Sequence, residues 1–459
     1  MSSKNGAAFT AYGWAVCLWA VVIPFQHGFH IAALNQIQAV MTCKEQTEPD
    51  IMNCIPMTDV VFSWVTAMFT VGGLFGSLAG NVSLDKLGRR NTNRLCASAI
   101  ILGSTLNGLG ANPAWLMAGR FIIGMGCGLG LVVGPVFISE IAPSTISGNV
   151  GVLTQLSIVI GIMISQITGL TLAKPSTWRY VFFVPAAICA TQLLVSSFIV
   201  ESPYYLLRKG RLEEHKAART RLWGEEIGAE SGPLLEEQVP RYVELAEEPA
   251  HQQEIGTFEA FKMKELRRPL LLVSLGMASQ QLSGMNAVLY YSNEILSKSL
   301  PTLGAYVSVA VAVTTVLMTF PPVFLLHKIG RRALLVISSA GAFITTIILG
   351  YSLDSYAPSA ATWSSVAIIV FVMSFALGLG PVPFLMISEV GPSHATSALS
   401  SVALSVSWVA NFMVGVAFLP LRNALAHGDS HREGLVFYVA VAAFALPTVF
   451  LLKMYKPST

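Results

Sequence analysis

Charged residues are scarce in this sequence. Asp, Glu, Lys and Arg make up only 12% of its 459 residues, whereas 53% are hydrophobic. Soluble domains carry roughly 25% charged residues, so this composition excludes an ordinary soluble domain. The formal net charge is only +3, which is too small to indicate a nucleic-acid partner.

Catalytic motifs are also lacking. The sequence contains no paired-histidine metal spacing, no Gly-rich phosphate loop and no evident nucleophile–base pair. We therefore expect neither an enzyme nor a bound metal or cofactor. Four of the six cysteines lie in or beside apolar runs, which indicates packing roles. Cys43 and Cys54 share one loop, where they form a disulfide only if that side of the membrane is oxidising.

Twelve long apolar runs dominate the sequence. Runs of about 18 residues or more can cross a bilayer as helices, and only helices and closed barrels satisfy their own backbone in lipid. These runs lack the strict alternation of barrel strands. The sequence therefore predicts an all-α membrane protein of twelve transmembrane helices, near 12–34, 60–82, 95–112, 115–138, 149–171, 180–200, 269–293, 303–326, 333–352, 362–387, 397–420 and 435–452.

The basic residues are distributed unevenly between the connections. Most of the 28 Lys and Arg residues fall in the two tails and the even-numbered connections. Because cytoplasmic loops are enriched in Lys and Arg, this bias places both termini in the cytoplasm. The same topology fits an integral multi-pass protein of the plasma membrane and one of a vacuolar or other internal membrane.

Two short motifs occur twice. Asp85-Lys-Leu-Gly-Arg-Arg90 resembles the stretch that ends in Arg331-Arg332. The Ser-Glu pair that contains Glu140 resembles the Ser-Glu pair that contains Glu389. Both repeats are separated by about 240 to 250 residues. Such duplication predicts two six-helix halves, with the substrate held between them. We assign residues 1–200 to the first half and 269–459 to the second. Residues 201–268 form a charged cytoplasmic linker with short helices expected at 211–223 and 236–246.

The repeated charges suggest a mechanical role. The arginines of both Gly-Arg-Arg turns and the two glutamates fall at cytoplasmic helix ends. Ion pairs between them would lock the two halves together there and would break when that side opens. The alternative is that the arginines only fix the topology.

The stretch 279–292 carries amides inside a run without charge. Gln280, Gln281 and Asn286 are costly to leave unpaired in hydrocarbon, so they join helices or face a wet cavity. Amides both donate and accept hydrogen bonds, as sugar hydroxyls do. A charged solute would require buried charges, and we expect none in the middles of the spans. Gln281 and Asn286 are five residues apart, about 140° around an ideal helix, and reach one ligand only if the helix deforms, which Gly284 permits.

Other spans add polar and aromatic candidates. Span one carries His30 among further polar residues, which indicates helix–helix hydrogen bonding or a cavity. Two Gly and two Pro within 378–383 predict a broken helix in span ten. Trp408 and Asn411 are three residues apart and share a face of span eleven, and Gln155 lies in span five.

The motifs resemble those of the sugar porter family of the major facilitator superfamily, across essentially all spans. The most specific stretches are 280–291, 119–124, Glu201-Ser-Pro203 and 380–383. The resemblance implies the major facilitator fold and alternating access by two six-helix halves. It implies sugar contacts at Gln155, Gln280, Gln281, Asn286, Phe384, Trp408 and Asn411, an outer gate at Tyr290 and Tyr291, and a cytoplasmic lock of Asp85, Arg89, Arg90, Glu140, Glu201, Arg331, Arg332 and Glu389.

Several positions depart from the family pattern. His30 stands where symporters carry an acid, Thr315 where an Asn sugar contact is common, and Ala376 where an acid is frequent. The lock is also altered: Ser147 and Thr396 replace arginines, and His327 replaces an acid. These changes raise the question of whether the lock slows or abolishes transport.

Three functions compete. The first is a transporter of a small neutral sugar, facilitative or proton-coupled, with a monomer sufficient for transport in the lipid bilayer. His30 makes coupling to a proton a specific question, because histidine titrates near neutral pH. The second is a sensor that binds sugar with little or no flux, which the altered lock favours and the short C-terminal tail disfavours. The third is a membrane enzyme, for which no catalytic grouping is evident.

Overall fold

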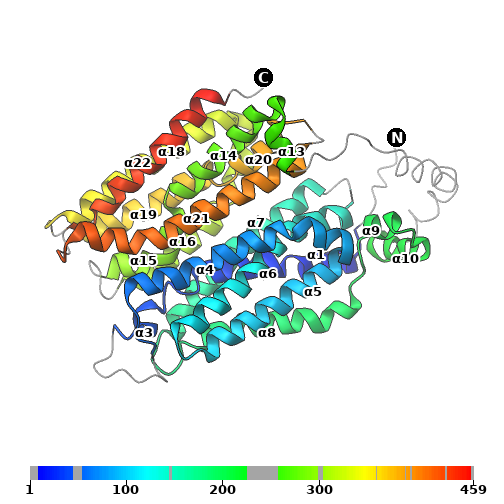
Figure 1. Cartoon of the computed structure of the whole chain (residues 1–459), viewed down its shortest axis with the longest axis horizontal. Helices are drawn as coiled ribbons and strands as arrows, with labels where there is room; N and C mark the ends of the chain where they lie inside the picture. Colours follow the sequence, from blue (N-terminus) through cyan, green and yellow to red (C-terminus); the bar gives the residue numbers. More distant parts are fainter. Residues whose placement is uncertain are drawn as a thin grey trace.

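The computed structural model describes residues 9–44, 54–143, 147–224, 257–297, 303–357, 359–387, 389–392, 395–429 and 432–455. Within these ranges the ordered elements are helices, and no strand occurs. Helices from the first part of the chain lie together, and helices from the last part lie beside them (Figure 1). We call these the first set and the second set.

The first set contains the first six predicted spans and one short helix. Thr10, Thr58 and Asn112 cap their helices by accepting backbone N–H bonds. The elements are α1 (Ala11–Ala20), α2 (Val22–Ala32), α3 (Gln38–Met41), α4 (Asp59–Leu78), α5 (Gly80–Leu109), α6 (Pro113–Ile141), α7 (Ser147–Leu172), α8 (Tyr180–Val195) and η1 (Ser196–Phe198).

The second set contains the last six predicted spans, three of which are interrupted. Its elements are α14 (Arg267–Leu282), α15 (Met285–Ser297), α16 (Gly304–Leu317), α17 (Pro321–Ile329), α18 (Arg331–Asp354), α19 (Ala360–Leu377), α20 (Val382–Ile387), α21 (Thr396–Ala426) and α22 (Leu435–Met454). The segment between the sets contributes α9 (Pro203–Arg208), α10 (Leu212–Trp223), α13 (Thr257–Lys262) and η2 (Lys264–Leu266).

Each of the twelve predicted spans corresponds to a helix or to a pair of helices. Nine segments in the described part of the chain are long and apolar enough to cross a membrane. Seven of them are built on a single α-helix, and two are the helix pairs α1 with α2 and α19 with α20. The other three spans are the part of α5 after Gly88, the pair α14 and α15, and the pair α16 and α17. The helix expected at 211–223 is α10, whereas the one expected at 236–246 lies outside the described residues.

Both Gly-Arg-Arg turns have the same backbone conformation. Gly88 and Gly330 each have a φ of 82°, a left-handed value that favours glycine. A Cβ at Gly88 would also come within 2.6 Å of the Glu201 carboxylate. The turn redirects the chain between two arms of α5, and the second turn separates α17 from α18. This shared geometry is what an internal duplication predicts.

The two sets meet along a few helices. In the packed structure α4 contacts α21, α7 contacts α16, and α2 contacts α15. Hydrogen bonds join the sets at the end of the molecule that carries α3. Nδ2 of Asn35 donates to Oγ of Ser292 over 2.9 Å, and Nε2 of Gln36 donates to the Ala305 carbonyl over 3.0 Å. Nδ2 of Asn423 donates to the Asp59 carboxylate over 2.8 Å at the same end. These contacts close that end in this structure.

Candidate functional site

The break between α14 and α15 brings the amides of the central stretch together. α14 ends at Leu282, α15 begins at Met285, and Gly284 between them has a φ of 92°. The change of direction lets Nδ2 of Asn286 donate a hydrogen bond to Oε1 of Gln281. An unbroken helix would place these side chains about 140° apart, so the deformation expected at Gly284 is what unites them.

Further hydrogen bonds extend this cluster to two neighbouring helices. Nε2 of Gln281 donates to Oγ of Ser407 on α21 over 2.8 Å, and to Oε1 of Gln280 over 3.1 Å. Nε2 of Gln280 donates to the carbonyls of Gly380 and Leu379, over 2.7 and 3.1 Å. Those carbonyls are accessible because span ten breaks between Leu377 and Val382, as its Gly and Pro residues predict.

Trp408 and Asn411 share one face of α21 at the boundary between the sets. Oδ1 of Asn411 accepts a hydrogen bond from the Tyr290 hydroxyl over 3.0 Å. The Trp408 ring lies 5.7 Å from the His27 ring and 6.3 Å from the Phe69 ring, both in the first set. Nε1 of Trp408 is buried without a hydrogen-bond partner. A buried indole N–H usually has a partner, so this donor is available to a bound hydroxyl.

The two tyrosines expected to form a gate are buried where the sets meet. Tyr290 and Tyr291 are 1% and 0% exposed. The Tyr291 hydroxyl donates to the Gly415 carbonyl over 2.9 Å, and its ring stacks on Phe418 at 5.4 Å. Phe62 of α4 meets the same ring from the first set at 6.3 Å. The tyrosines therefore seal the boundary on the side of α3.

Gln155 and Phe384 lie outside the hydrogen-bonded cluster. Gln155 is on α7, and Phe384 is on α20, and both side chains are exposed. Thr315, which stands where an Asn is common, donates to the Val311 carbonyl of its own helix over 2.8 Å. The cluster that the structure assembles thus consists of Gln280, Gln281, Asn286 and Ser407. The Tyr290–Asn411 pair forms a separate hydrogen bond between α15 and α21. Ser407 was not identified from the sequence, because its partner is decided by the break at Gly284.

The expectation that the middles of the spans carry no charge is wrong. Arg120 on α6 is fully buried. Its Nη1 donates to the His30 carbonyl over 2.7 Å, and its guanidinium lies 4.6 Å from the centre of the Phe69 ring. Nε and Nη2 have no hydrogen-bond partner. The Gly119–Gly124 motif contains this arginine, and a charge within so apolar a run was the signal that could have identified it.

His30 itself is completely buried beside this arginine. Its Nε2 lies 3.4 Å from Oγ of Ser104, and its Nδ1 is without a hydrogen-bond partner. The candidate residue for proton coupling therefore lies beside the positive charge of Arg120. A protonated imidazole at this place would face unfavourable repulsion from the guanidinium.

The charges of the first Gly-Arg-Arg turn form a buried network. Nε of Arg89 donates to Glu140 over 2.7 Å, and a second guanidinium bond reaches the same carboxylate at 2.6 Å. Glu201 accepts the backbone N–H groups of Arg89 and Arg90, over 2.8 and 3.1 Å. Burial raises the pKa of the Glu201 carboxyl, although the backbone N–H bonds oppose this shift. Asp85 pairs with Arg208 of α9 over 2.9 Å.

The second turn repeats part of this pattern. Arg331 pairs with Glu389, and Nη2 of Arg332 donates to the Leu452 carbonyl over 3.3 Å. The expected pairs thus exist, but each lies within one set of helices, so in this structure they do not join the two halves. That corrects the mechanical interpretation of the repeat. The side chains of Ser147, His327 and Thr396 lie outside the described residues.

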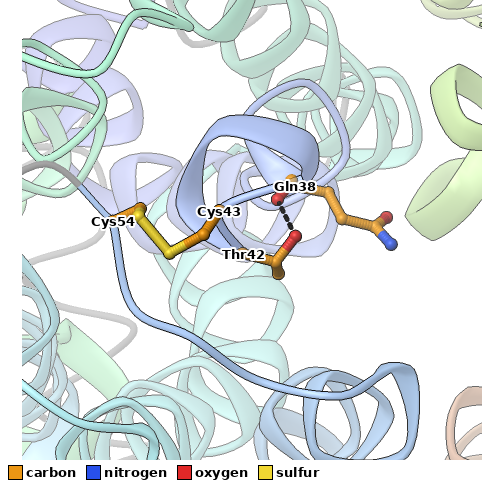
Figure 2. Close-up of a disulfide and its surroundings, with 4 residues drawn as sticks. All are labelled: Gln38, Thr42, Cys43 and Cys54. Carbon is orange, nitrogen blue, oxygen red and sulfur yellow. Dashed lines mark hydrogen bonds between the residues drawn. A yellow bond between two sulfur atoms is a disulfide. The ribbon is translucent and has the colours of Figure 1, made fainter. Parts of the chain in front are cut away.

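The two loop cysteines are joined by a disulfide (Figure 2). Cys43 follows α3 with a φ of 61°, just after Thr42, whose hydroxyl donates to the Gln38 carbonyl over 2.8 Å. The Ile55 N–H donates to the Met41 carbonyl over 2.8 Å and holds the returning chain beside α3. The other four cysteines, Cys17, Cys96, Cys127 and Cys189, are buried and free.

The geometry describes a membrane transporter with two helical sets and a polar cluster at their boundary. Residues 16–458 match the family described as Sugar (and other) transporter. The chain is 31% identical over 452 residues to the solute carrier family 2, facilitated glucose transporter member 3, of Bos taurus, covering 94% of this chain and 86% of that protein. It is 26% identical over 462 residues to a probable metabolite transport protein of Saccharomyces cerevisiae, covering 94% and 89%.

Solved structures show the same fold. The inward open structure of the xylose transporter XylE from E. coli superposes with a TM-score of 0.76 at 19% identity, covering 97% of both chains. The chain belongs to the sugar porter family of the major facilitator superfamily. It is a multi-pass membrane protein with the twelve-helix fold of that superfamily.

Proposed function

We propose that this protein carries a small neutral sugar, a hexose or related polyol, across the membrane by facilitated diffusion through alternating access. The observation that supports this most directly is the amide cluster at the break between α14 and α15, at the boundary between the two sets. The relatives in the family include proteins named as glucose transporters.

The chemistry of the cluster suits a sugar. Gln281 and Asn286 satisfy each other and Ser407, and a sugar hydroxyl can replace any of these partners because it both donates and accepts. Trp408 offers an apolar face and an unpaired N–H, and Asn411 adds a further amide. Gln155 and Phe384, exposed on α7 and α20, would complete the site from opposite sets when these approach each other.

Alternating access follows from where the contacts lie. Residues 1–200 and 269–459 act as two halves in this proposal, joined by the linker 201–268. The contacts of Asn35 with Ser292 and of Phe62 with Tyr291 cross the boundary on the side of α3 and would separate when that side opens. The networks at Arg89 and Arg331 stiffen each half at its other end. Both termini are cytoplasmic by the distribution of basic residues, and one chain suffices.

The position of His30 favours facilitated diffusion over proton coupling. Its ring is buried and its carbonyl holds the Arg120 guanidinium. Proton coupling would need the ring to gain a positive charge during the cycle, next to an existing one. Uptake into vesicles should therefore equilibrate and be indifferent to an imposed pH gradient. Accumulation above equilibrium that is lost in His30→Ala would establish coupling instead.

The sugar site is tested by uptake of labelled sugars into proteoliposomes that contain purified protein. Gln281→Ala should lower uptake by about tenfold, the loss that roughly 1.4 kcal/mol of binding free energy produces. Ser274→Ala is the matched control, because Ser274 lies two turns earlier on α14 and makes no hydrogen bond to the cluster in the described part of the chain. Unchanged uptake in Gln281→Ala would refute the site, and sugar binding without flux would identify a sensor.

A further inference from the structure

A cavity lies away from the amide cluster, beside the first Gly-Arg-Arg turn. It has a volume of about 400 Å³ and opens between the kink of α5, η1 with the residues that follow it, and helices α9 and α10. Figure 1 shows α9 and α10 together beyond the ends of the first set, next to α1 and α5. None of the residues of the amide cluster lines this cavity.

The cavity has a positively charged lining. Lys86 and Arg90 contribute from the two arms of α5, and Arg221 from the last turn of α10. Nε of Arg90 is buried without a hydrogen-bond partner, and Lys86 forms no ion pair with another described residue. Arg221 lies over the Tyr12 ring at 4.3 Å.

The acidic residues of the lining do not neutralise these cations fully. Glu214 is paired with Arg211 through two hydrogen bonds of 2.8 and 2.6 Å. Glu201 accepts backbone N–H groups, among them those of Arg90 and Ser202. Three cations, Lys86, Arg90 and Arg221, therefore face one carboxylate that is already engaged with the backbone. Such a surplus favours an anion.

Apolar side chains also line the cavity, close to a surface that faces lipid. Leu87, Ile199 and Leu206 line the cavity. Next to it, Leu194 and Phe198 at the end of α8 and in η1 are 78% and 71% exposed, as expected for side chains that face lipid. A ligand that carries both a phosphate and apolar or sugar carbons fits this combination of cationic and apolar walls.

We propose that this cavity binds the phosphate group of an anionic molecule, either the headgroup of an inner-leaflet phosphoinositide or a soluble phosphate ester. Basic pockets at the cytoplasmic edge of transmembrane helices bind such headgroups. Lys86, Arg90 and Arg221 hold the phosphate. Because they come from both arms of α5 and from α10, an occupant ties these three segments together. A ligand bound at this site would therefore regulate the movement of the first set of helices.

The test measures binding to the purified full-length protein at 150 mM salt, where diffuse attraction is screened beyond about 8 Å. Three probes are titrated: dioctanoyl phosphatidylinositol 4-phosphate, its water-soluble headgroup inositol 1,4-bisphosphate, and glucose 6-phosphate. The variant is Lys86→Gln with Arg221→Gln. Its control is Lys264→Gln with Lys453→Gln, which removes two exposed cations of η2 and α22 that lie outside the cavity.

We expect saturable binding of at least one probe, weakened about 30-fold in the cavity variant and unchanged in the control. That factor corresponds to about 2 kcal/mol for two lost charges. Preference for the lipid over its headgroup would identify a phosphoinositide, and tighter binding of glucose 6-phosphate would identify a soluble ester. Absence of saturable binding, or an equal loss in both double variants, would overturn the proposal. Because the readout is binding, it is independent of whether the protein transports sugar.

Discussion

Asn286 donates a hydrogen bond from Nδ2 to Oε1 of Gln281, although the two residues belong to different helices, α15 and α14. The pair exists only because the chain turns at Gly284, whose φ is 92°. A polar cluster of this kind depends on the backbone as much as on its side chains. The conformation of one glycine therefore controls the candidate sugar site.

Gly284→Ala should impair transport through this backbone effect. A Cβ at Gly284 would meet no heavy atom within 4 Å, so the cost arises from the left-handed conformation, about 1–2 kcal/mol. We expect uptake to fall about tenfold with normal expression. The control is Gly276→Ala in the same helix, where a Cβ would lie 3.5 Å from Pro383, an ordinary contact. Equal uptake by the two variants would show that the break has no role.

Gly73→Ala should displace Trp408. Gly73 on α4 packs beneath the indole of Trp408 on α21, and a Cβ there would lie 2.5 Å from two ring carbons. Because Trp408 is 5% exposed, the ring has little room to shift. We expect sugar uptake to fall at least about fivefold, because overpacked sites lose about 1–3 kcal/mol and about 1 kcal/mol corresponds to a factor of about five. Ser77→Ala, one turn later on α4, is the control, since its hydroxyl bonds only to the Leu74 carbonyl. Normal uptake by Gly73→Ala would exclude Trp408 as a sugar contact.

Removal of the disulfide should destabilise the loop after α3. Cys43 and Cys54 are 11 residues apart, and a crosslink over so short a loop contributes about 3 kcal/mol by reducing the entropy of the unfolded chain. The double variant Cys43→Ser with Cys54→Ser should lower the midpoint of thermal unfolding by several degrees. The midpoint is measured by a fluorescence method that does not react with thiols. Cys17→Ser, which alters a buried free cysteine, distinguishes loss of the crosslink from loss of a thiol. Labelling of Cys43 and Cys54 by maleimide in the unreduced wild type would contradict the pairing.

The packing of α10 on α9 should weaken at acidic pH. Nδ1 of His215 donates to the Pro203 carbonyl over 2.8 Å, and burial lowers the pKa of the imidazole below its usual 6.5. A lowered pKa in the folded protein means that the unfolded segment binds the proton more readily. The stability is therefore present above pH 6.5 and is lost as the pH falls below it.

Hydrogen exchange measures this effect directly. Exchange over residues 203–223, corrected for the intrinsic rate, should accelerate between pH 7.5 and 5.5 in the wild type. His215→Gln should remove most of the pH dependence, while Lys216→Gln, an exposed neighbour, should preserve it. A pH dependence that persists in His215→Gln would assign the effect to another group.

Much of the architecture followed from the sequence. Twelve apolar runs predicted the spans, because lipid forces long apolar segments to be helical. The break in span ten was predicted from the Gly and Pro residues at 378–383, which favour a bend or a break in a helix. Gly284 permitted the break in span seven but did not by itself predict it. Repetition of the Gly-Arg-Arg turns predicted an internal duplication, and the structure adds that Gly88 and Gly330 share one backbone conformation.

The partners of these residues required the tertiary structure. Which side chains meet depends on how each helix is rotated and on how far it is displaced along its axis, and a sequence motif specifies neither. For that reason the Arg89–Glu140 and Arg331–Glu389 pairs proved to lie within each half, and Ser407 proved to be a partner of Gln281. The buried Arg120 illustrates the same limit, since its hydrogen bond to the His30 carbonyl depends on the packing of α6 against α2.

The sequence by itself determined that this chain is a helical membrane protein of two similar halves, with amides in the uncharged stretch 279–292. These features depend on the local composition of each segment and on the lipid around it, so any segment of that composition would show them. Only the tertiary structure decided that the break at Gly284 joins Gln281 to Asn286, that a guanidinium lies beside His30, and that α10 covers a cationic cavity. Those relationships arise between segments far apart in the chain, where packing geometry selects the neighbours.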